Sequence, residues 1–347
     1  MAWLSPLPDR VTDRDVYEAT ARFGIVPDCT DLHCFRVLVA WGLGALPGMS
    51  LAKWKIYAVI CNAVAAVAVG ELAPRLGVSA AGSRLAVLLT AGGFGSLYTL
   101  HDVYTSDPLM FALGPVMMQA LIDGRAAVAG MLGTIGVFGK EFAAVPLFVA
   151  AAWHGLERHW EQALASLSWA LLAFIVWLVL QLTLILQFNY GYGDNPSTHL
   201  LGGGYLLPWI QKLSPRGAAS ALFNEYGALY LLAPAGWWIA GSSLRRLVVV
   251  SLPVALLFAY VQQPDRALWN FHFLAVPLSV LVLEQAPGAV AWTCAGLFVL
   301  ANLKVGSQLP MAPNARFGLA LSCLLAAGAV ATALRAHSTT ARAELAG

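Results

Sequence analysis

The sequence of 347 residues contains little charge. Only 11% of its residues are Asp, Glu, Lys or Arg, whereas a typical soluble domain has about 25%. Hydrophobic residues make up 59% of the chain, and the mean hydropathy is +0.71. A water-soluble fold of this length cannot cover its surface with so few charged side chains. The composition therefore excludes a soluble globular protein, a disordered chain and a secreted disulfide scaffold, and it predicts a protein whose solvent is lipid.

An excess of charge of one sign is also missing. The 20 basic and 18 acidic residues give a formal net charge of +2, so no basic face for nucleic acid is indicated. The five cysteines include no CxxC pair and no Cys/His zinc spacing. Cys29 and Cys34 lie in one polar segment, close enough to pair if that segment faces an oxidising compartment; otherwise they stay free thiols.

Long apolar runs fill most of the chain. A spanning helix needs about 20 mostly apolar residues, and the strands of a membrane barrel would alternate polar and apolar residues instead. We therefore predict an all-α, polytopic integral membrane helical bundle, with short or broken helices because several runs fall below a full crossing. The runs are 54–73, 85–100, 107–122, 126–153, 163–187, 226–241, 246–261, 267–285, 289–305 and 316–335.

The runs divide the chain into four predicted regions. These are an outer acidic loop with an interfacial helix (1–53), an N-terminal transmembrane half with the proposed site (54–187), an outer loop or lid (188–225), and a C-terminal transmembrane half with a cytoplasmic tail (226–347). The positive-inside rule places the short turns that contain Arg75, Arg125 and Arg245–Arg246 in the cytoplasm. In the lid, the glycine run at 202–204 precedes an apolar patch.

Lys140 and Glu141 interrupt the apolar run 126–153. An ionisable residue inside a membrane costs about 2.5–3.5 kcal/mol, and adjacent helix positions point roughly 100° apart, so the two charges neutralise each other poorly within one helix. We predict a V with both charges at its outer-facing tip; the alternative is one tilted helix with two snorkelling charges. Glycines recur at every third position and favour close packing of the first limb: Gly130, Gly133, Gly136 and Gly139.

Other charges are predicted on the same outer side. Asp107–Pro108 has the pattern of a helix start, with Asp107 as the N-cap, whereas His101 and Asp102 have no such structural role. Asp13 and Asp15 have the Asp-x-Asp spacing that can share a divalent cation or hold a sugar hydroxyl. A solvated acidic N-terminus is the plainer interpretation of these two carboxylates.

Three passages carry a resemblance to a known family. They are Asp13-Arg-Asp-Val-Tyr-Glu-Ala-Thr-Ala-Arg-Phe-Gly24, Cys34-Phe-Arg-Val-Leu-Val-Ala-Trp41, and the order Asp107-Pro-Leu, Gly124-Arg-Ala, Gly139-Lys-Glu141. In these passages, over roughly 13–150, the chain resembles bacterial polytopic membrane glycosyltransferases of the GT-C fold, a group that includes polyprenyl-phosphate-sugar-dependent mannosyltransferases. Members begin with a spanning helix before the acidic loop, and we expect this helix either to lie upstream or to be lacking here.

The resemblance implies an enzyme of the bacterial inner (cytoplasmic) membrane, a multi-pass hexosyltransferase. It would move a sugar from a polyprenyl-phosphate-linked donor to a glycan, lipid or protein hydroxyl on the non-cytosolic face. Such transfer needs a carboxylate base for the acceptor and cations for the leaving phosphate. Asp15, with Asp13 beside it, is the expected base. The expected substrate-binding residues are Arg36, His101, Asp102, Asp107, Lys140, Glu141, Asp265 and Arg266.

No cofactor is required by this pattern, although a divalent cation stays open, and no dedicated metal ligand is predicted. The expected partners are the lipid-linked donor, the acceptor and membrane lipid, without nucleic acid. A secondary transporter or lipid-linked-sugar flippase would explain buried charges and broken helices equally well, as a midplane site between repeats. Its signature would be internal symmetry, and the second half contains no copy of Gly139-Lys-Glu141. A non-catalytic membrane assembly subunit is the third alternative.

Overall fold

The computed structural model describes residues 12–191, 223, 226–261, 268–303 and 312–346. Every regular element in these ranges is a helix, which confirms the all-α prediction. The α-helices before the lid segment are α1 (Thr12–Phe23), α2 (Val37–Gly44), α3 (Ser50–Leu72), α4 (Ala80–Ala91), α5 (Phe94–His101), α6 (Asp107–Ile122), α7 (Ala126–Gly136), α8 (Val145–Leu156) and α9 (Trp160–Phe188). After it come α13 (Leu229–Ile239), α14 (Ser242–Val261), α16 (His272–Leu283), α17 (Gly288–Asn302) and α18 (Ala312–Ala346), and the four short 3-10 helices are η1 (Leu32–Phe35), η2 (Ala73–Leu76), η3 (Glu141–Ala144) and η4 (Leu268–Phe271).

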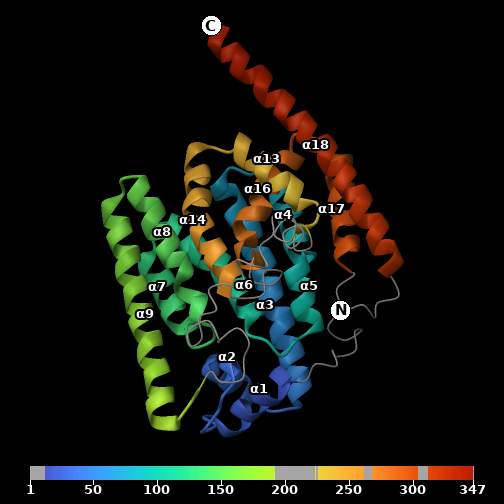
Figure 1. Cartoon of the computed structure of the whole chain (residues 1–347). Helices are drawn as coiled ribbons and strands as arrows, with labels where there is room; N and C mark the ends of the chain where they lie inside the picture. The colour runs from blue at the N-terminus through green and yellow to red at the C-terminus, as the bar shows by residue number, and fades with distance from the viewer. Residues whose placement is uncertain (1–11, 192–222, 224–225, 262–267, 304–311, 347) are drawn as a thin grey trace.

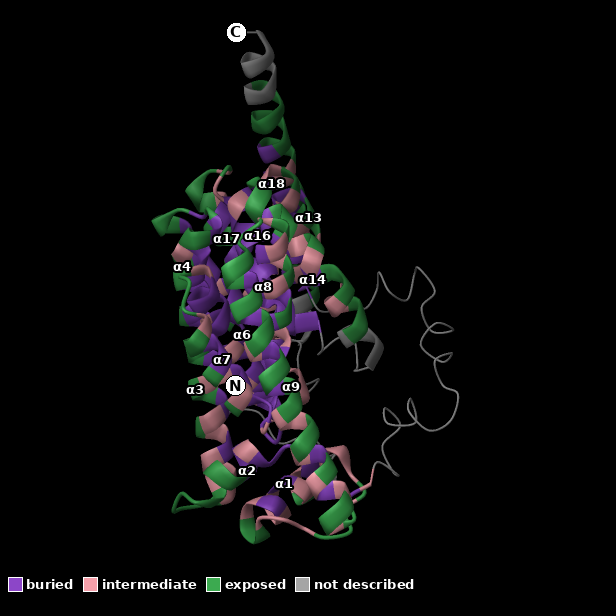
Figure 2. Ribbon diagram, turned by 90° about the vertical axis from the view of Figure 1, so that its left-hand side faces the viewer, coloured by how far each residue is buried: buried purple, intermediate pink, exposed green. Residues whose placement is uncertain are grey.

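The helices form a bundle around α3 and α6, which pack against each other (Figure 1). One flank of the bundle consists of α7, α8 and α9, and the other contains α4, α13, α16 and α17. The short helices α1 and α2 lie together at one end, at the bottom of Figure 1. Buried residues fill the interior between the helices, and exposed residues follow their outer faces (Figure 2).

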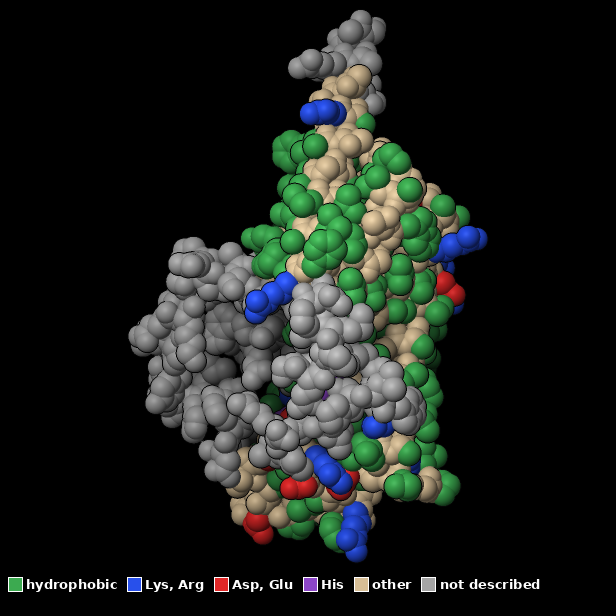
Figure 3. Space-filling model, turned by 90° about the vertical axis from the view of Figure 1, so that its right-hand side faces the viewer, with side chains coloured by type: hydrophobic (Ala, Val, Ile, Leu, Met, Phe, Trp, Pro, Cys, Tyr) green, Lys and Arg blue, Asp and Glu red, His purple; other side chains and the backbone are tan. Residues whose placement is uncertain are grey.

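Within the described ranges, three stretches are long and apolar enough to cross a membrane: Ser50–Leu76, Trp160–Phe188 and Arg316–Thr339. Seven shorter apolar helices of 10–17 residues accompany them in the same ranges. The outer surface is itself apolar, because α9 exposes large side chains such as Leu171, Phe174 and Ile175. On the face in Figure 3, hydrophobic side chains cover most of the described upper bundle, with a few charged side chains among them, and acidic and basic side chains gather towards the end with α1. Lipid suits such a surface better than water does.

The apolar run predicted over 85–100 is divided into two helices, because Gly92 and Gly93 separate α4 from α5. A Cβ atom on Gly92 would lie 2.3 Å from Val299, and one on Gly93 would lie 1.9 Å from the ring of Trp269. Asn302 donates a hydrogen bond to the Gly92 carbonyl oxygen at 3.0 Å. Side chains of neighbouring helices therefore occupy the space that residues larger than glycine would need at positions 92 and 93.

The predicted break in 126–153 is confirmed, since α7 ends at Gly136 and α8 begins at Val145. Lys140 contacts Asp107 at the start of α6, whereas His154 of α8 lies beside the backbone of Leu121 near the end of α6. The chain therefore descends along α6 in α7, reverses at Lys140–Glu141, and returns in α8. A single tilted helix is excluded.

Arg75 of η2, Arg125 before α7 and Arg246 in the first turns of α14 share the opposite end of the bundle. Arg75 and Arg125 both pair with Asp123, directly after α6, at 2.8 and 2.9 Å. Arg246 pairs at 2.9 Å with Glu157, directly after α8. The short arginine turns thus lie together at one end, and the Lys140–Glu141 bend lies at the other.

The glycines of α7 pack closely against their neighbours, as predicted. A Cβ atom on Gly130 would lie 2.0 Å from the Trp169 ring of α9, and one on Gly136 would lie 2.7 Å from both Leu113 of α6 and Ala143. At these separations the neighbouring side chain must move.

We predict that Gly130→Ala lowers the free energy of unfolding by about 1–3 kcal/mol, because the added methyl group forces the Trp169 ring away from α7. The matched control is Gly296→Ala in α17, where a Cβ atom meets nothing within 4 Å and alanine is the better helix former. Thermal unfolding of the purified variants measures both. Equal melting temperatures for the two variants would contradict the close contact.

Candidate functional site

The charges at the bend pair with two different partners. Lys140 binds the carboxylate of Asp107, and Glu141 accepts hydrogen bonds from Arg36 Nη2 at 2.7 Å and Nε at 3.1 Å. Lys140 and Asp107 are each 3% exposed, and Arg36 is 7% exposed. Each charge therefore has an opposite charge at hydrogen-bonding distance in a place where an uncompensated one would be costly.

Asp107 is not the N-cap of its helix, and this part of the prediction is wrong. Helix α6 begins at Asp107, and Ser106 is its N-cap. The Asp107 carboxylate binds Lys140 instead. The ion pair with Lys140 determines where the Asp107 side chain points. The sequence before Pro108 gives no indication of this pairing.

Helix α1 is fastened to this end of the bundle through Tyr17. The Tyr17 ring is fully buried, with its centroid 5.1 Å from that of Trp54 in α3 and 5.4 Å from that of His33. Its hydroxyl contacts Ser106 Oγ at 3.5 Å, beside the start of α6. Burial raises the pKa of Tyr17, and the positive charge of Arg36 opposes that rise. The N-terminal carboxylates and the Lys140–Glu141 bend therefore lie at the same end.

The two carboxylates of the Asp-x-Asp motif point in different directions. Asp13 is half-buried, and its Oδ2 lies 3.5 Å from Nε2 of His33, whereas Asp15 is exposed. Residues two apart on an α-helix point roughly 200° apart, so one ion cannot be shared between these side chains. Among the residues that the structure describes, no group of three or more His, Cys, Asp or Glu side chains is placed to hold a metal ion.

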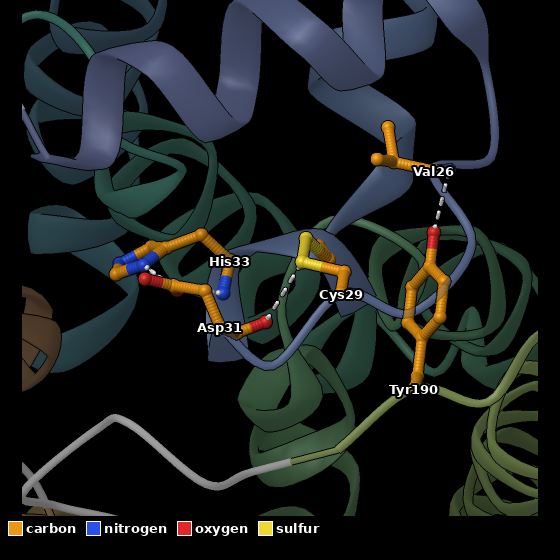
Figure 4. The surroundings of a disulfide bond; sticks show 6 residues. Val26, Cys29, Asp31, His33 and Tyr190 are labelled. Atoms are coloured by element: carbon orange, nitrogen blue, oxygen red, sulfur yellow. Dashed lines mark hydrogen bonds and ion pairs between the residues drawn. A yellow bond between two sulfur atoms is a disulfide. The ribbon is translucent and has the colours of Figure 1, made fainter.

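A disulfide between Cys29 and Cys34 closes the loop that contains His33 (Figure 4). Within the loop, Asp31 accepts a hydrogen bond from the His33 backbone at 2.8 Å and lies 2.6 Å from His33 Nδ1. Burial opposes ionisation of Asp31, but the hydrogen bonds from His33 outweigh it and lower the pKa of this carboxyl. The sequence left the pairing of the two cysteines open, and it gave no reason to select Asp31 or His33.

The end of α9 is bonded to the same loop. Asn189 donates from Nδ2 to Asp28 Oδ1 at 2.6 Å, and the Gly191 N–H donates to the Cys29 carbonyl at 2.9 Å. The Val26 N–H donates to the Tyr190 hydroxyl at 3.0 Å (Figure 4). These bonds hold the loop between α1 and the last turn of α9.

A cavity of about 50 Å³ lies beside Glu141, between the disulfide loop and α9. A space of this size is enough for a few water molecules. The polar groups at its wall come from Glu141 and from Gln181 of α9. The other lining residues are Leu32, Phe35, Val137 and Trp177.

The other predicted substrate-binding residues are His101, Asp102, Asp265 and Arg266. His101 is buried at the last position of α5, and Asp102 is the C-cap of that helix and accepts from the Tyr98 hydroxyl at 3.3 Å. Asp265, Arg266 and the lid glycines at 202–204 lie outside the described residues.

No protein-family model matches this chain, and no curated protein matches its sequence. The site is known by its geometry. It consists of a half-buried carboxylate and imidazole, two ion pairs at the same end of the bundle, and a small, mostly apolar cavity beside Glu141.

We predict that Lys140→Met lowers the free energy of unfolding by about 3–5 kcal/mol, because it leaves the buried Asp107 without its counter-charge. The double variant Lys140→Met/Asp107→Leu removes both charges and should recover most of this loss. Unfolding of both single variants and the double variant gives the coupling energy of the pair. Additive effects of the two substitutions would argue against a direct ion pair.

The disulfide should stabilise the fold by about 2 kcal/mol, the loop-entropy value for so short a ring. Cys29→Ser/Cys34→Ser is therefore expected to melt at a lower temperature than the unmodified protein. A reductant should lower the melting temperature of the unmodified protein and leave that of the double variant unchanged. An equal effect of reductant on both proteins would contradict the assignment.

Proposed function

We propose that this chain is a multi-pass membrane glycosyltransferase of the GT-C kind. It moves a sugar from a polyprenyl-phosphate donor to a hydroxyl acceptor at the membrane face on which α1 lies. In the described part of the chain, three long apolar helices and seven shorter ones support insertion in a bilayer. Ionisable residues inside such a bundle are candidates for function, and the buried Arg36, Asp107 and Lys140 gather at one end.

The observation that carries the proposal is that Asp13 and the Arg36–Glu141 and Lys140–Asp107 pairs lie at the same end of the bundle. Tyr17 connects them, because the charges of Asp13 and Arg36 both act on its hydroxyl. Glycosyl transfer needs a base at the acceptor and cations at the leaving phosphate, a few ångströms apart on one reaction centre. Carboxylates and cations dispersed over both ends of the bundle would not serve this chemistry.

Two independent features support the same orientation. Disulfides persist in oxidising compartments, so the Cys29–Cys34 loop is assigned to the non-cytosolic side. The positive-inside rule assigns Arg75, Arg125 and Arg246, at the opposite end, to the cytoplasm. We therefore propose the bacterial inner membrane, with the site on its outer face.

The geometry favours Asp13 over Asp15 as the base, because Asp13 contacts His33 whereas Asp15 is exposed. Arg36 is the preferred phosphate ligand. Its guanidinium has five N–H donors; Glu141 takes two of them, and Tyr17 is also hydrogen-bonded to the guanidinium. Asp107 holds Lys140 in the same end of the bundle, so the cations are oriented before a phosphate arrives.

A lipid-borne donor also needs a path from the bilayer. The cavity beside Glu141 has Trp177 and Gln181 of α9 in its wall, while Ile175 and Val179 on the same helix are exposed. In a bilayer, the outer face of α9 would therefore contact acyl chains next to the polar cluster. This arrangement suits a substrate with an apolar tail and a phosphate head.

We expect Asp13→Asn to lower sugar transfer by about 100-fold or more, the usual contribution of a general base. The matched control Asp15→Asn, two residues along the same helix, should stay within about twofold of the unmodified protein, since its carboxylate is exposed. The assay follows radiolabelled mannose from polyprenyl-phosphate-mannose into acceptors in membrane vesicles. Full activity of both variants would remove the base assignment. Solute uptake by proteoliposomes without any sugar transfer would instead favour a transporter.

A further inference from the structure

His33 lies between two carboxylates that come from different segments. Its Nδ1 is 2.6 Å from Asp31 Oδ1, and its Nε2 is 3.5 Å from Asp13 Oδ2. The His33 side chain is 15% exposed, and the two carboxylates are about twice as exposed, at 29% and 30%. An imidazole with a carboxylate at each nitrogen has a fixed orientation and two routes for a proton.

The surroundings hold this arrangement in place. Asp31 is the N-cap of η1, and the disulfide closes the loop on either side of it. The titratable or charged groups that face His33 are Asp13 and Tyr17 from α1, Asp31 from its own loop, and Arg36 at the end of η1, whose charge also acts on Asp31. The nearby side chain from α3 is Trp54, which does not titrate.

We propose that His33 is a positioning residue that takes over the acceptor proton from Asp13, with Asp31 fixing its tautomer. This inference rests on the proposed function. Asp31 accepts the Nδ1 proton of neutral His33, so the lone pair on Nε2 faces Asp13. Protonation of Nε2 then gives an imidazolium with a carboxylate on either side.

In the proposed transfer step, the acceptor oxygen forms a bond to the anomeric carbon of the donor sugar. The bond from that carbon to the phosphate oxygen breaks, and its electron pair stays on the phosphate. The proton of the acceptor hydroxyl passes to Asp13 and from there to Nε2 of His33, which later releases it to water. The products are the glycosylated acceptor and polyprenyl phosphate, and no oxidant or reductant is needed.

Asp31→Asn tests the role of the charge without removing the cap, because asparagine caps helices as well as aspartate does. We expect kcat for mannose transfer from polyprenyl-phosphate-mannose to fall about 10-fold, comparable to losses of other orienting partners, with KM for the donor unchanged. Asp31 orients the His33 ring through Nδ1, so its loss should slow the chemical step and leave donor binding unaffected. Asp28→Asn is the control, since Asp28 lies on the same loop and contacts Asn189 instead.

His33→Ala should lower kcat by about 100-fold, and added imidazole should restore part of the loss. A loss without imidazole rescue, together with an unchanged kcat for Asp31→Asn, would show that His33 only supports the loop. Full activity of His33→Ala would overturn the inference while the proposed function stands. If the unmodified protein transfers no sugar, the proposed function itself fails, and the relay with it.

Discussion

Lys140 and Glu141 are neighbours of opposite charge, but their side chains point in different directions and cannot neutralise each other. The first half of the fold depends on the separate partners that neutralise these two charges. Each needs an opposite charge in its own direction, because an uncompensated charge in an apolar bundle costs several kcal/mol. The backbone bends where the two side chains diverge, so Lys140 binds Asp107 on one side and Glu141 binds Arg36 on the other. The reversal between α7 and α8 follows, and the close packing of α7 is possible because its facing residues are glycines.

The same pairs connect the bundle to the N-terminal helices. Arg36 stands between η1 and α2, so its bond to Glu141 fixes the disulfide loop against the bend. Tyr17 fixes α1 against α3 and the start of α6. As a result the ion pairs, Asp13 and His33 lie at the same end of the bundle, and Asp13 and His33 are partly exposed there. In the proposed mechanism, this arrangement would supply the fixed charges that electrostatic preorganisation requires.

Much of the architecture could be predicted from the sequence, because apolar runs, charge placement and glycine spacing are local properties. The helical content, the bend at Lys140 and the small-residue face of α7 are examples. The pairing of the buried charges could not be predicted from local sequence. Arg36 is 105 positions from Glu141, and Arg36 or Lys140 could each have paired with Asp107 or Glu141. The division at Gly92–Gly93 depends on Trp269 and Val299, which are distant in sequence. His33 was missed because a lone histidine in a polar loop has no distinctive signal before its two carboxylates are placed.

Helix α9 has 29 residues, so its length is about 43 Å, against roughly 30 Å for a hydrocarbon core. A rod longer than its solvent layer tilts until its apolar length matches the layer. Its last turn is bonded to the loop of Asp28 and Cys29, a few residues from His33. In a bilayer, a change in the tilt of α9 would therefore displace that loop, and the thickness of the bilayer would influence the geometry around the imidazole.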